Sequence, residues 1–327
     1  MEMIRRIPKL LTSAAPVVLI GALLYAGIFI KPSPHGAEVA NPAFERGDQF
    51  YGISVSTSGA SRTILLAGAH GKLLRSTDDG KTWTLSNAHI DGVLQDVGSW
   101  SDGRSIAVGD RGAVLVSGAG ARDWHQVNVP LSGISNKLLR VRLLPDGEAW
   151  AVGEGGVMLH TSDYGGTWTN RGTLEDIAWN DVALYGKHGV AIGEFGRITL
   201  TDDGGKTWHS VPSPVKSSLM AVAFRDSSNV IAVGLSGTIL SSADGGEHWT
   251  QLPVATREHL FDVVWSGADW IATGDKGVVA RGDPAGDLWR ISRVSDRSRG
   301  WYVRVAVSRQ NCYFVGSAFA AVPNCAG

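Results

Sequence analysis

The chain has 327 residues, with 30 Lys and Arg against 31 Asp and Glu, which gives a formal net charge of −1 and an isoelectric point of about 6.8. This balance argues against a nucleic-acid partner, because nucleic-acid binding normally needs a basic face. It leaves open local charged patches that could serve a protein partner.

An apolar segment near the N-terminus predicts a membrane anchor. Arg5, Arg6 and Lys9 precede residues 10–30, which contain no charged residue and are long enough to span a bilayer as a helix. Positive charge before the span places the N-terminus in the cytoplasm. We expect residues 1–31 to form a cytoplasmic tip and a transmembrane helix in the inner membrane, with the rest on the periplasmic or lumenal side. A cleaved signal peptide is the alternative, although its apolar region would be unusually long.

The rest of the chain divides into a linker and one large domain. Residues 32–48 are polar with several prolines, as is typical of a linker. Residues 49–327 are then one domain, longer than most single domains, which is usual for a repeat fold.

A short phrase, [ST]-x-D-x-G-x-x-W, recurs four times in this domain. This Asp-box occupies residues 76–83, 161–168, 201–208 and 242–249. Asp suits a turn because its carboxylate accepts backbone N–H bonds, and Trp anchors the turn by burying a large ring. We therefore assign a structural role to the paired Asp and Trp residues, which are Asp78 and Trp83, Asp163 and Trp168, Asp203 and Trp208, and Asp244 and Trp249.

The spacing of these phrases predicts the architecture. Tryptophans recur every 40 to 44 residues at positions 83, 124, 168, 208, 249 and 289, although the second and sixth boxes around them are eroded. A glycine recurs fifteen residues before each, at positions 68, 109, 153, 193, 234 and 274, and Gly316 continues the series. A period of this length indicates a repeat fold, and each unit holds about four short strands. Seven glycine markers predict an all-β, seven-bladed β-propeller.

The two cysteines, Cys312 and Cys325, both fall in the last predicted blade. If this unit forms the same hairpin as the others, they lie nearly opposite each other on adjacent strands. A disulfide is then expected, and it fits an oxidising compartment. Two unpaired thiols are the alternative. Without a nearby histidine the pair does not complete a metal site.

Charged residues recur at one position of the inner strands. Aligned units place Gly52, Asp96, Arg140, Asp181, Ala221, Asp262 and Arg304 in one register. Inner strands line the channel of a propeller, so these residues are expected around one of its mouths. The turns after the glycine markers should share that face and carry His70, Arg111, Glu154, Glu194, Asp275 and Lys276, with the Asp-boxes on the opposite face. We weigh two interpretations equally. One is a solvated ring of mutual ion pairs, and the other is a partner-binding surface made of Asp96, Arg111, Arg140, Asp181, Asp262 and Arg304.

The fuller phrase A-[IV]-G-x-x-G-x-I-x-x-[ST]-x-D-G-G-x-x-W, at 191–208 and 232–249, resembles the photosystem II assembly and stability factor family, including its relatives in non-photosynthetic bacteria. The resemblance covers nearly all of the chain after the linker. It implies a propeller outside the cytoplasm that helps to assemble or stabilise a membrane protein complex without catalysis and without a cofactor. In a non-photosynthetic host, it implies an accessory to an exporter-type membrane protein.

A sialidase-like glycoside hydrolase is the alternative, since Asp-boxes also occur in sialidases. Arg111, Arg140 and Arg304 could converge on a substrate carboxylate, and Tyr51 or Tyr302 could supply a nucleophile. However, the Phe/Tyr-Arg-Ile-Pro signature of sialidases is missing from the propeller. The Asp-box carboxylates occur once per blade, so they cannot meet as a catalytic pair must. The nine histidines show no metal-ligand spacing, and we expect neither catalytic residues nor a metal.

Overall fold

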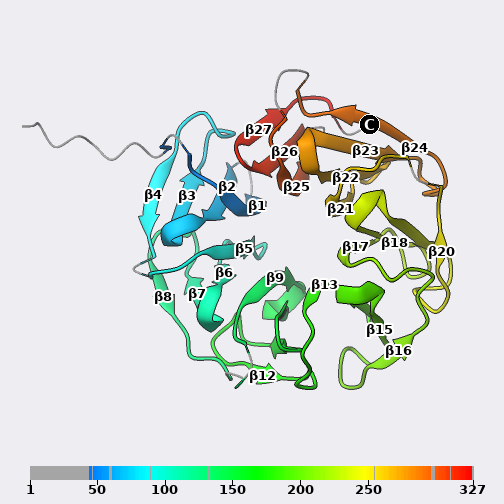
Figure 1. The fold of residues 1–327 in the computed structure, drawn as a ribbon. Helices are drawn as coiled ribbons and strands as arrows, with labels where there is room; N and C mark the ends of the chain where they lie inside the picture. Colours follow the sequence, from blue (N-terminus) through cyan, green and yellow to red (C-terminus); the bar gives the residue numbers. More distant parts are fainter. Residues whose placement is uncertain are drawn as a thin grey trace, which may run out of the picture. The chain divides into compact units, whose positions relative to one another are not determined.

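The computed structural model describes residues 44–45, 47–58, 61–88, 90–130, 133, 135–253, 255–295, 299–309 and 311–325. Seven antiparallel sheets lie side by side in a ring, each with its first strand innermost (Figure 1). Six sheets have four strands and the seventh has three. The seven-bladed β-propeller predicted from the repeat spacing is therefore confirmed.

The four strands of each blade follow one another outward from the centre. The inner strands are β1 (Phe50–Ser58), β5 (Leu94–Ser99), β9 (Leu138–Leu143), β13 (Trp179–Tyr185), β17 (Leu219–Phe224), β21 (Leu260–Trp265) and β25 (Tyr302–Ser308). The second strands are β2 (Ser61–Gly68), β6 (Ser105–Gly109), β10 (Ala149–Gly153), β14 (His188–Gly193), β18 (Val230–Gly234), β22 (Trp270–Gly274) and β26 (Asn311–Gly316). The third strands are β3 (Lys72–Ser76), β7 (Val114–Ser117), β11 (Met158–Thr161), β15 (Ile198–Thr201), β19 (Ile239–Ser242), β23 (Val278–Gly282) and β27 (Phe319–Val322). The outer strands are β4 (Thr84–Asn87), β8 (Trp124–Gln126), β12 (Thr169–Asn170), β16 (His209–Val211), β20 (Thr250–Gln251) and β24 (Trp289–Arg293).

Two faces of the ring follow from this strand order. One face carries the turns between second and third strands, and we call it the turn face. Five of these turns contain a 3₁₀ helix, namely η1 (Ala69–Gly71), η2 (Asp110–Gly112), η4 (Glu194–Gly196), η5 (Leu235–Gly237) and η6 (Asp275–Gly277). The other face carries the Asp-boxes between third and outer strands, and we call it the box face. There, η3 (Pro145–Gly147) joins β9 to β10, and the Gly147 carbonyl accepts a bond from Tyr164 N of an Asp-box.

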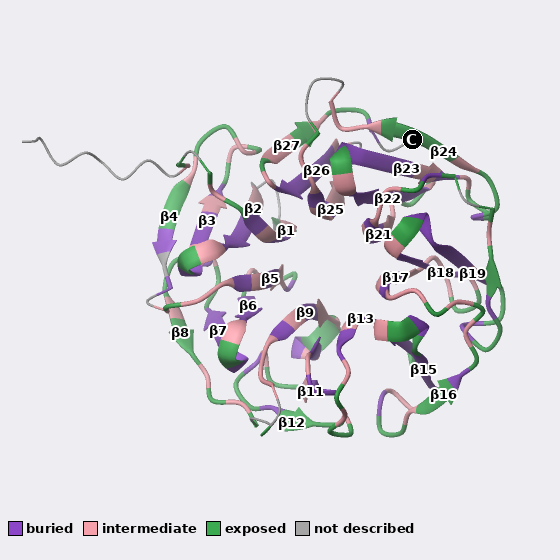
Figure 2. Ribbon diagram, viewed as in Figure 1, coloured by how far each residue is buried: buried purple, intermediate pink, exposed green. Residues whose placement is uncertain are grey.

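The core lies between neighbouring blades, and the exposed residues concentrate on the outer strands (Figure 2). The second strands are apolar on both sides because each sheet is covered by two others; β6, β10 and β18 are buried along their whole length. This explains the repeated Ala-Val-Gly. A Cβ on the marker Gly153 would collide with the carbonyl oxygen of Lys137, so the strand admits only glycine there.

Two described residues of the predicted linker, Phe44 and Asp48, contact the propeller. The Phe44 ring lies 5.3 Å from the rings of both Phe50 and Trp83, and Lys72 Nζ lies 2.7 Å from Asp48 Oδ2. The predicted membrane span at 10–30 lies outside the described residues, and no helix within them is long and apolar enough to cross a bilayer.

Candidate functional site

The inner-strand residues predicted from the repeat register do meet at the centre of the ring. Aspartates stand on the second, fourth and sixth blades, arginines on the third and seventh, and small residues on the first and fifth. Gly52 on the first blade is small because a Cβ there would collide with the backbone of Asp96. This alternation brings three carboxylates and the arginines into one network, which we call the channel network: Asp96, Arg140, Arg142, Asp181, Asp262 and Arg304.

The carboxylates of the channel network join each even-numbered blade to the next. Asp96 Oδ2 accepts a bond from Val141 N at 3.1 Å, and Asp181 Oδ2 accepts one from Val222 N at 3.0 Å. Asp262 Oδ2 accepts one from Val305 N at 2.9 Å in the same way. Asp96 and Asp181 also accept from the residue that follows each of them. These bonds hold inner strands of neighbouring sheets together, where no ladder connects them.

Arg140 bridges two of these carboxylates across the channel. Its Nη2 lies 3.0 Å from Asp181 Oδ2 and 2.5 Å from Asp262 Oδ1. The side chains of Arg140, Asp181 and Asp262 are 1%, 0% and 3% exposed. Arg142, two residues further along the same strand face, forms a bidentate pair with Asp181 at 2.9 and 2.6 Å. The two ion pairs of Arg140 are therefore shielded from water, and breaking a buried pair from one side is costly.

Arg304 completes the channel network from the seventh blade. Its Nη2 donates to the Leu139 carbonyl at 3.1 Å, and its Nε lies 3.6 Å from Asp96 Oδ1. With three arginines and three aspartates, the formal charges cancel. The network thus leaves no net formal charge at this level of the channel.

The pKa values reflect this packing. Burial disfavours the charged form of Asp181, but Arg140 and Arg142 outweigh it and hold the pKa of Asp181 well below its usual range. Burial likewise works against charged Arg140, yet Asp181 and Asp262 raise the pKa of Arg140 above its usual value. Burial, and then the like charge of Arg140, lower the pKa of Arg304 to about 10. At neutral pH Asp181, Arg140 and Arg304 are therefore charged.

A funnel of about 300 Å³ opens from the channel network toward the box face. Its wall carries mostly small or apolar residues, including Gly98, Val264 and Ala306, and Arg142 is the charged group on its side. Four members of the channel network also line it, namely Asp96, Arg140, Asp262 and Arg304.

This geometry corrects the interpretation of the ring as a partner surface. The side chains of Asp96, Arg140, Asp181 and Asp262 are buried, because each forms hydrogen bonds to a neighbouring blade. They are therefore not available to bind a partner. Arg111 does not join them. It is exposed at the tip of η2 on the turn face, in the left-handed region with φ of 57°. The mutual ion pairs of the first interpretation are present, but they are buried instead of solvated.

Other predicted turn residues also lie on the turn face and serve local structure. Glu154 Oε2 accepts a bond from Ser135 Oγ at 2.6 Å, and Glu194 Oε2 accepts one from Ala178 N at 2.9 Å. His70 and Lys276 are exposed at the tips of η1 and η6. His70, Arg111 and Lys276 thus offer charge or a titratable ring to solvent on the turn face, which the buried channel network does not.

The Asp-boxes form the expected local hydrogen-bond pattern. In the third blade, Asp163 Oδ1 accepts bonds from Thr161 Oγ1 and Thr167 N at 2.7 and 2.8 Å, and Thr161 Oγ1 accepts one from Gly165 N. Trp168 Nε1 donates to the Gly165 carbonyl at 3.0 Å. The boxes of Asp78, Asp203 and Asp244 have the same carboxylate bonds. Trp83 and Trp249 also make the indole bond.

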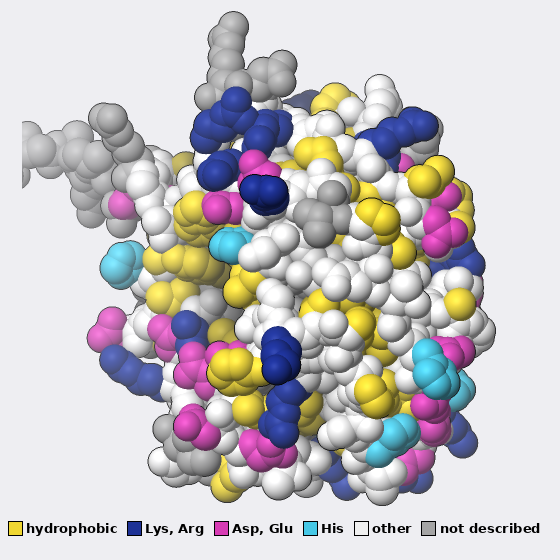
Figure 3. Space-filling view, turned by 45° about the vertical axis from the view of Figure 1, so that its right-hand side comes forward, with side chains coloured by type: hydrophobic (Ala, Val, Ile, Leu, Met, Phe, Trp, Pro, Cys, Tyr) yellow, Lys and Arg dark blue, Asp and Glu magenta, His cyan; other side chains and the backbone are white. Residues whose placement is uncertain are grey.

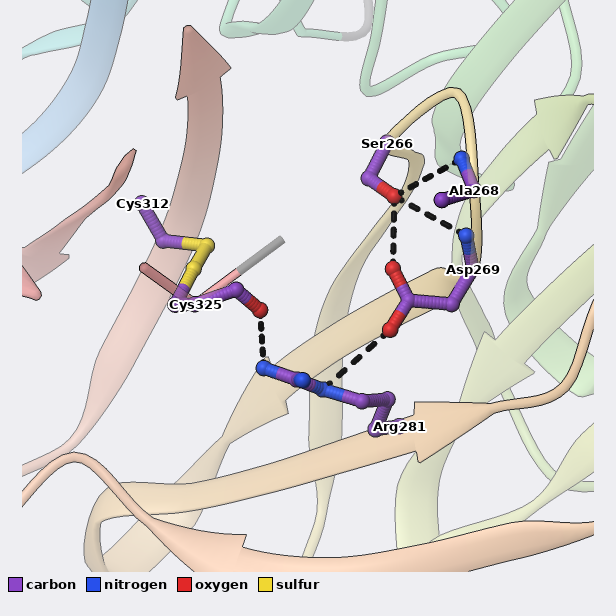
Figure 4. The surroundings of a disulfide bond; sticks show 6 residues. All are labelled: Ser266, Ala268, Asp269, Arg281, Cys312 and Cys325. Atoms are coloured by element: carbon purple, nitrogen blue, oxygen red, sulfur yellow. Dashed lines mark hydrogen bonds and ion pairs between the residues drawn. A yellow bond between two sulfur atoms is a disulfide. The ribbon is translucent and has the colours of Figure 1, made fainter. Parts of the chain in front are cut away.

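Cys312 and Cys325 are joined in a disulfide, with their Cα atoms 5.8 Å apart (Figure 4). Cys312 lies on β26, and Cys325 lies three residues beyond the end of β27. Arg281 of the sixth blade donates to the Cys325 carbonyl and pairs with Asp269 at 3.3 Å. The disulfide and this arginine together fix the end of the three-stranded blade to its neighbour.

One group of potential metal ligands was not visible as a spacing in the sequence. Among the described residues, Asp202, His209 and Glu247 place ligand atoms within 4.8 Å of one another, and all three are exposed. Asp202 and Glu247 lie in the Asp-boxes of the fourth and fifth blades, and His209 begins β16. Figure 3 shows histidine and acidic side chains gathered at its lower right. We assign no metal to this exposed group.

The groups that a sialidase would require do not come together. Arg111 is exposed on the turn face, Arg140 is buried between two aspartates, and Arg304 contacts backbone carbonyls. Tyr302 is buried at the start of β25, and Tyr51 donates to Gln49 at 2.7 Å. Nothing in this arrangement favours glycoside hydrolysis.

The fold and its repeated turns define the class of protein: a seven-bladed β-propeller with Asp-box repeats. Three overlapping segments, residues 83–176, 116–216 and 206–312, match the family described as Photosynthesis system II assembly factor YCF48. The chain belongs to this family, as the fuller repeat phrase predicted.

Relatives and solved structures agree with this family. The photosystem II assembly proteins Ycf48 of Synechococcus sp. strains JA-3-3Ab and JA-2-3B'a(2-13) are 26% and 27% identical over 156 residues. Each alignment spans 46% of this chain and 45% of the relative, less than half of either. A solved structure of YCF48 bound to D1 peptide has a TM-score of 0.70 at 16% identity, covering 85% of this chain and 94% of that one. YCF48 from Cyanidioschyzon merolae has a TM-score of 0.68 at 15% identity, covering 85% and 96%.

Proposed function

We propose that this protein is a non-enzymatic, membrane-anchored propeller that assists the assembly or stability of a membrane protein complex. The observation that carries the proposal is the match to the YCF48 assembly factor family across residues 83–312. A solved structure of YCF48 bound to D1 peptide, which has the same fold, supports a role in recognising a protein segment.

The channel geometry supports a scaffold in preference to a catalyst. The ionisable groups at the centre are used in ion pairs and in bonds to neighbouring blades. Such a network stiffens the ring, and a stiff ring presents its loops in fixed positions, which suits recognition. We propose that the turn face and the clefts between blades, rather than the channel, contact the partner.

The location of the propeller is part of the proposal. Arg5, Arg6 and Lys9 before the apolar segment at 10–30 support an anchor with the propeller on the periplasmic or lumenal side. The disulfide of Cys312 and Cys325 fits that compartment. A reporter active only in the cytoplasm, fused after Gly327, should be silent, and a strong signal would place the propeller on the wrong side.

The identity of the partner depends on whether the host is photosynthetic. We propose a photosystem II subunit in a photosynthetic host and an exporter-type membrane protein in a non-photosynthetic one. Affinity-tagged protein should retain a membrane protein when it is purified from detergent-solubilised membranes.

Arg111→Glu is the variant that tests whether this retention depends on the turn face, because Arg111 is the exposed member of the predicted charged set. Charge reversal there should weaken retention in a salt-dependent way while leaving the melting temperature unchanged. Purification of the tagged protein without any membrane protein, or turnover of a glycoside by it, would contradict the proposal.

A further inference from the structure

A groove of about 500 Å³ lies between the third and fourth blades, and the channel network has no part in it. The connectors at 171–175 and 213–216 border it, and β15 and β16 form its floor. Its size falls within the range of known ligand sites. Three features of its lining distinguish it from the corresponding regions of the other blades.

The first feature is the displaced tryptophan of the fourth-blade Asp-box. Trp208 Nε1 is buried and has no hydrogen-bond partner among the described residues, although the boxes of Trp83, Trp168 and Trp249 each make a bond to a glycine carbonyl. The cause is Trp150 on the preceding blade.

Trp150 stands where the blades that precede the boxes of Trp168 and Trp249 carry the smaller Ile106 and Val190. Its ring lies against Gly205, at a place where Ile106 contacts Gly165 and Val190 contacts Gly246. Trp208 therefore packs edge-on against Trp150, with ring centroids 5.6 Å apart, and forms part of the groove wall. Because its indole bond is missing, Trp208 is the tryptophan of a complete box that can reorient at the least cost.

The second feature is Phe195 at the rim, on the tip of η4. Its side chain is 69% exposed, and its backbone is in the left-handed region with φ of 56°. The same turn position carries His70, Arg111, Ser236 and Lys276 in other blades. A bulky aromatic residue is unfavourable both in this backbone conformation and in water, so its place at the rim suits contact with a partner.

The third feature is an excess of positive charge. Arg171, Arg197 and Lys216 line the groove together with Glu175. Arg197 Nη1 and Glu175 Oε2 form an ion pair at 2.5 Å, whereas Arg171 and Lys216 are exposed and form no ion pair with a described residue. Three cations and one anion leave a local charge of +2, which is complementary to an acidic partner.

We propose that this groove binds an extended peptide segment of a partner protein, with an aromatic or aliphatic side chain flanked by acidic residues. The apolar side chain would lie between Phe195 and Trp208, and its acidic neighbours would face Arg171 and Lys216. The inference deepens the proposed function and rests on it for its biological meaning. Peptide binding is measured with isolated peptides, so this inference can fail while the protein still retains a membrane protein on purification. Equally, the protein can bind peptides and still retain no membrane protein.

The test is a selection of random phage-displayed 12-residue peptides on the full chain held in detergent micelles. We expect enriched peptides to combine a large apolar residue with Asp or Glu. Phe195→Ser should weaken their binding by roughly tenfold, as for truncation of a central apolar anchor. Arg171→Glu with Lys216→Glu should abolish it. Leu288→Ser is the matched control, because Leu288 is a similarly exposed apolar residue, 71% accessible, on the sixth blade.

The indole N–H resonance of Trp208, assigned by its disappearance in Trp208→Phe, should shift when a selected peptide is added. Unchanged melting temperatures would show that the variants remain folded. Three results would overturn the proposal: enrichment of basic peptides, equal binding by the groove variants and the control, or no enrichment at all. A dimer that Phe195→Ser converts to a monomer would assign the groove to a second copy of the chain instead.

Discussion

Removal of the Arg140 charge is the sharpest perturbation of the channel. Arg140→Met keeps a long unbranched side chain but leaves Asp181 and Asp262 without their shared cation. Asp181 keeps its bidentate partner Arg142. Among the described residues, Asp262 then keeps the bond from Val305 N, and its 2% exposure leaves it little access to water. Breaking a buried pair from one side costs about 3–5 kcal/mol of unfolding free energy, so we expect a loss in that range.

Urea unfolding of the full chain in detergent, followed by circular dichroism, measures this loss. Adding Asp262→Asn to Arg140→Met removes the stranded charge, so the double variant should recover part of the loss, which a double-mutant cycle would show. Arg111→Met is the control, because that arginine is exposed and its loss should change stability by less than about 0.5 kcal/mol. An Arg140→Met protein as stable as the wild type would refute the argument that this network holds the blades together.

Further predictions concern the turns and the last blade. Thr161→Val removes the buried hydroxyl that accepts from Gly165 N, and should cost about 1–3 kcal/mol in the same urea assay; an unchanged midpoint would contradict it. Hydrogen bonds from the side chain and then the backbone of Thr82 lower the pKa of Asp78 to about 2. Its stabilisation should be complete above about pH 4 and fade as the pH falls toward 2, whereas a carboxyl NMR titration with a midpoint near 4 would argue against this. Replacing Cys312 and Cys325 by Ser opens a link with a sequence separation of 13, and should lower the unfolding free energy by about 3 kcal/mol; a melting temperature equal to that of the oxidised wild type would be inconsistent with a stabilising bridge.

Much of the fold was predictable because each blade repeats the same local sequence pattern of strands and turns. The glycine markers and the Asp-box tryptophans recur at a fixed interval, and that interval alone gave seven blades and the register of the inner strands. The register also correctly brought Asp96, Arg140 and Arg304 to one level of the channel.

The burial of those residues was not predictable, because it depends on partners from other blades. Asp181 lies 41 residues from both Arg140 and Val222, its hydrogen-bond partners on the neighbouring blades. The role of Arg142 was also missed, although its position two residues after Arg140 places both on the same face of the strand.

Two departures within the repeats also escaped prediction. The eroded box of the sixth blade still forms its turn, because Asp283 Oδ1 accepts from Asp287 N and Leu288 N, one position earlier than the repeat would place it. The displacement of Trp208 depends on the size of Trp150 in the preceding blade, so it cannot be seen in the box sequence itself.

The central claim is that the protein acts on a membrane protein complex and not on a small-molecule substrate. The most direct measurement is a comparison of native membrane complexes, separated by size and identified by mass spectrometry, between the host and a strain lacking this chain. The account predicts that one membrane complex shifts toward smaller assembly intermediates, and that the full-length chain restores it. Unchanged membrane complexes in the deletion strain would contradict the account.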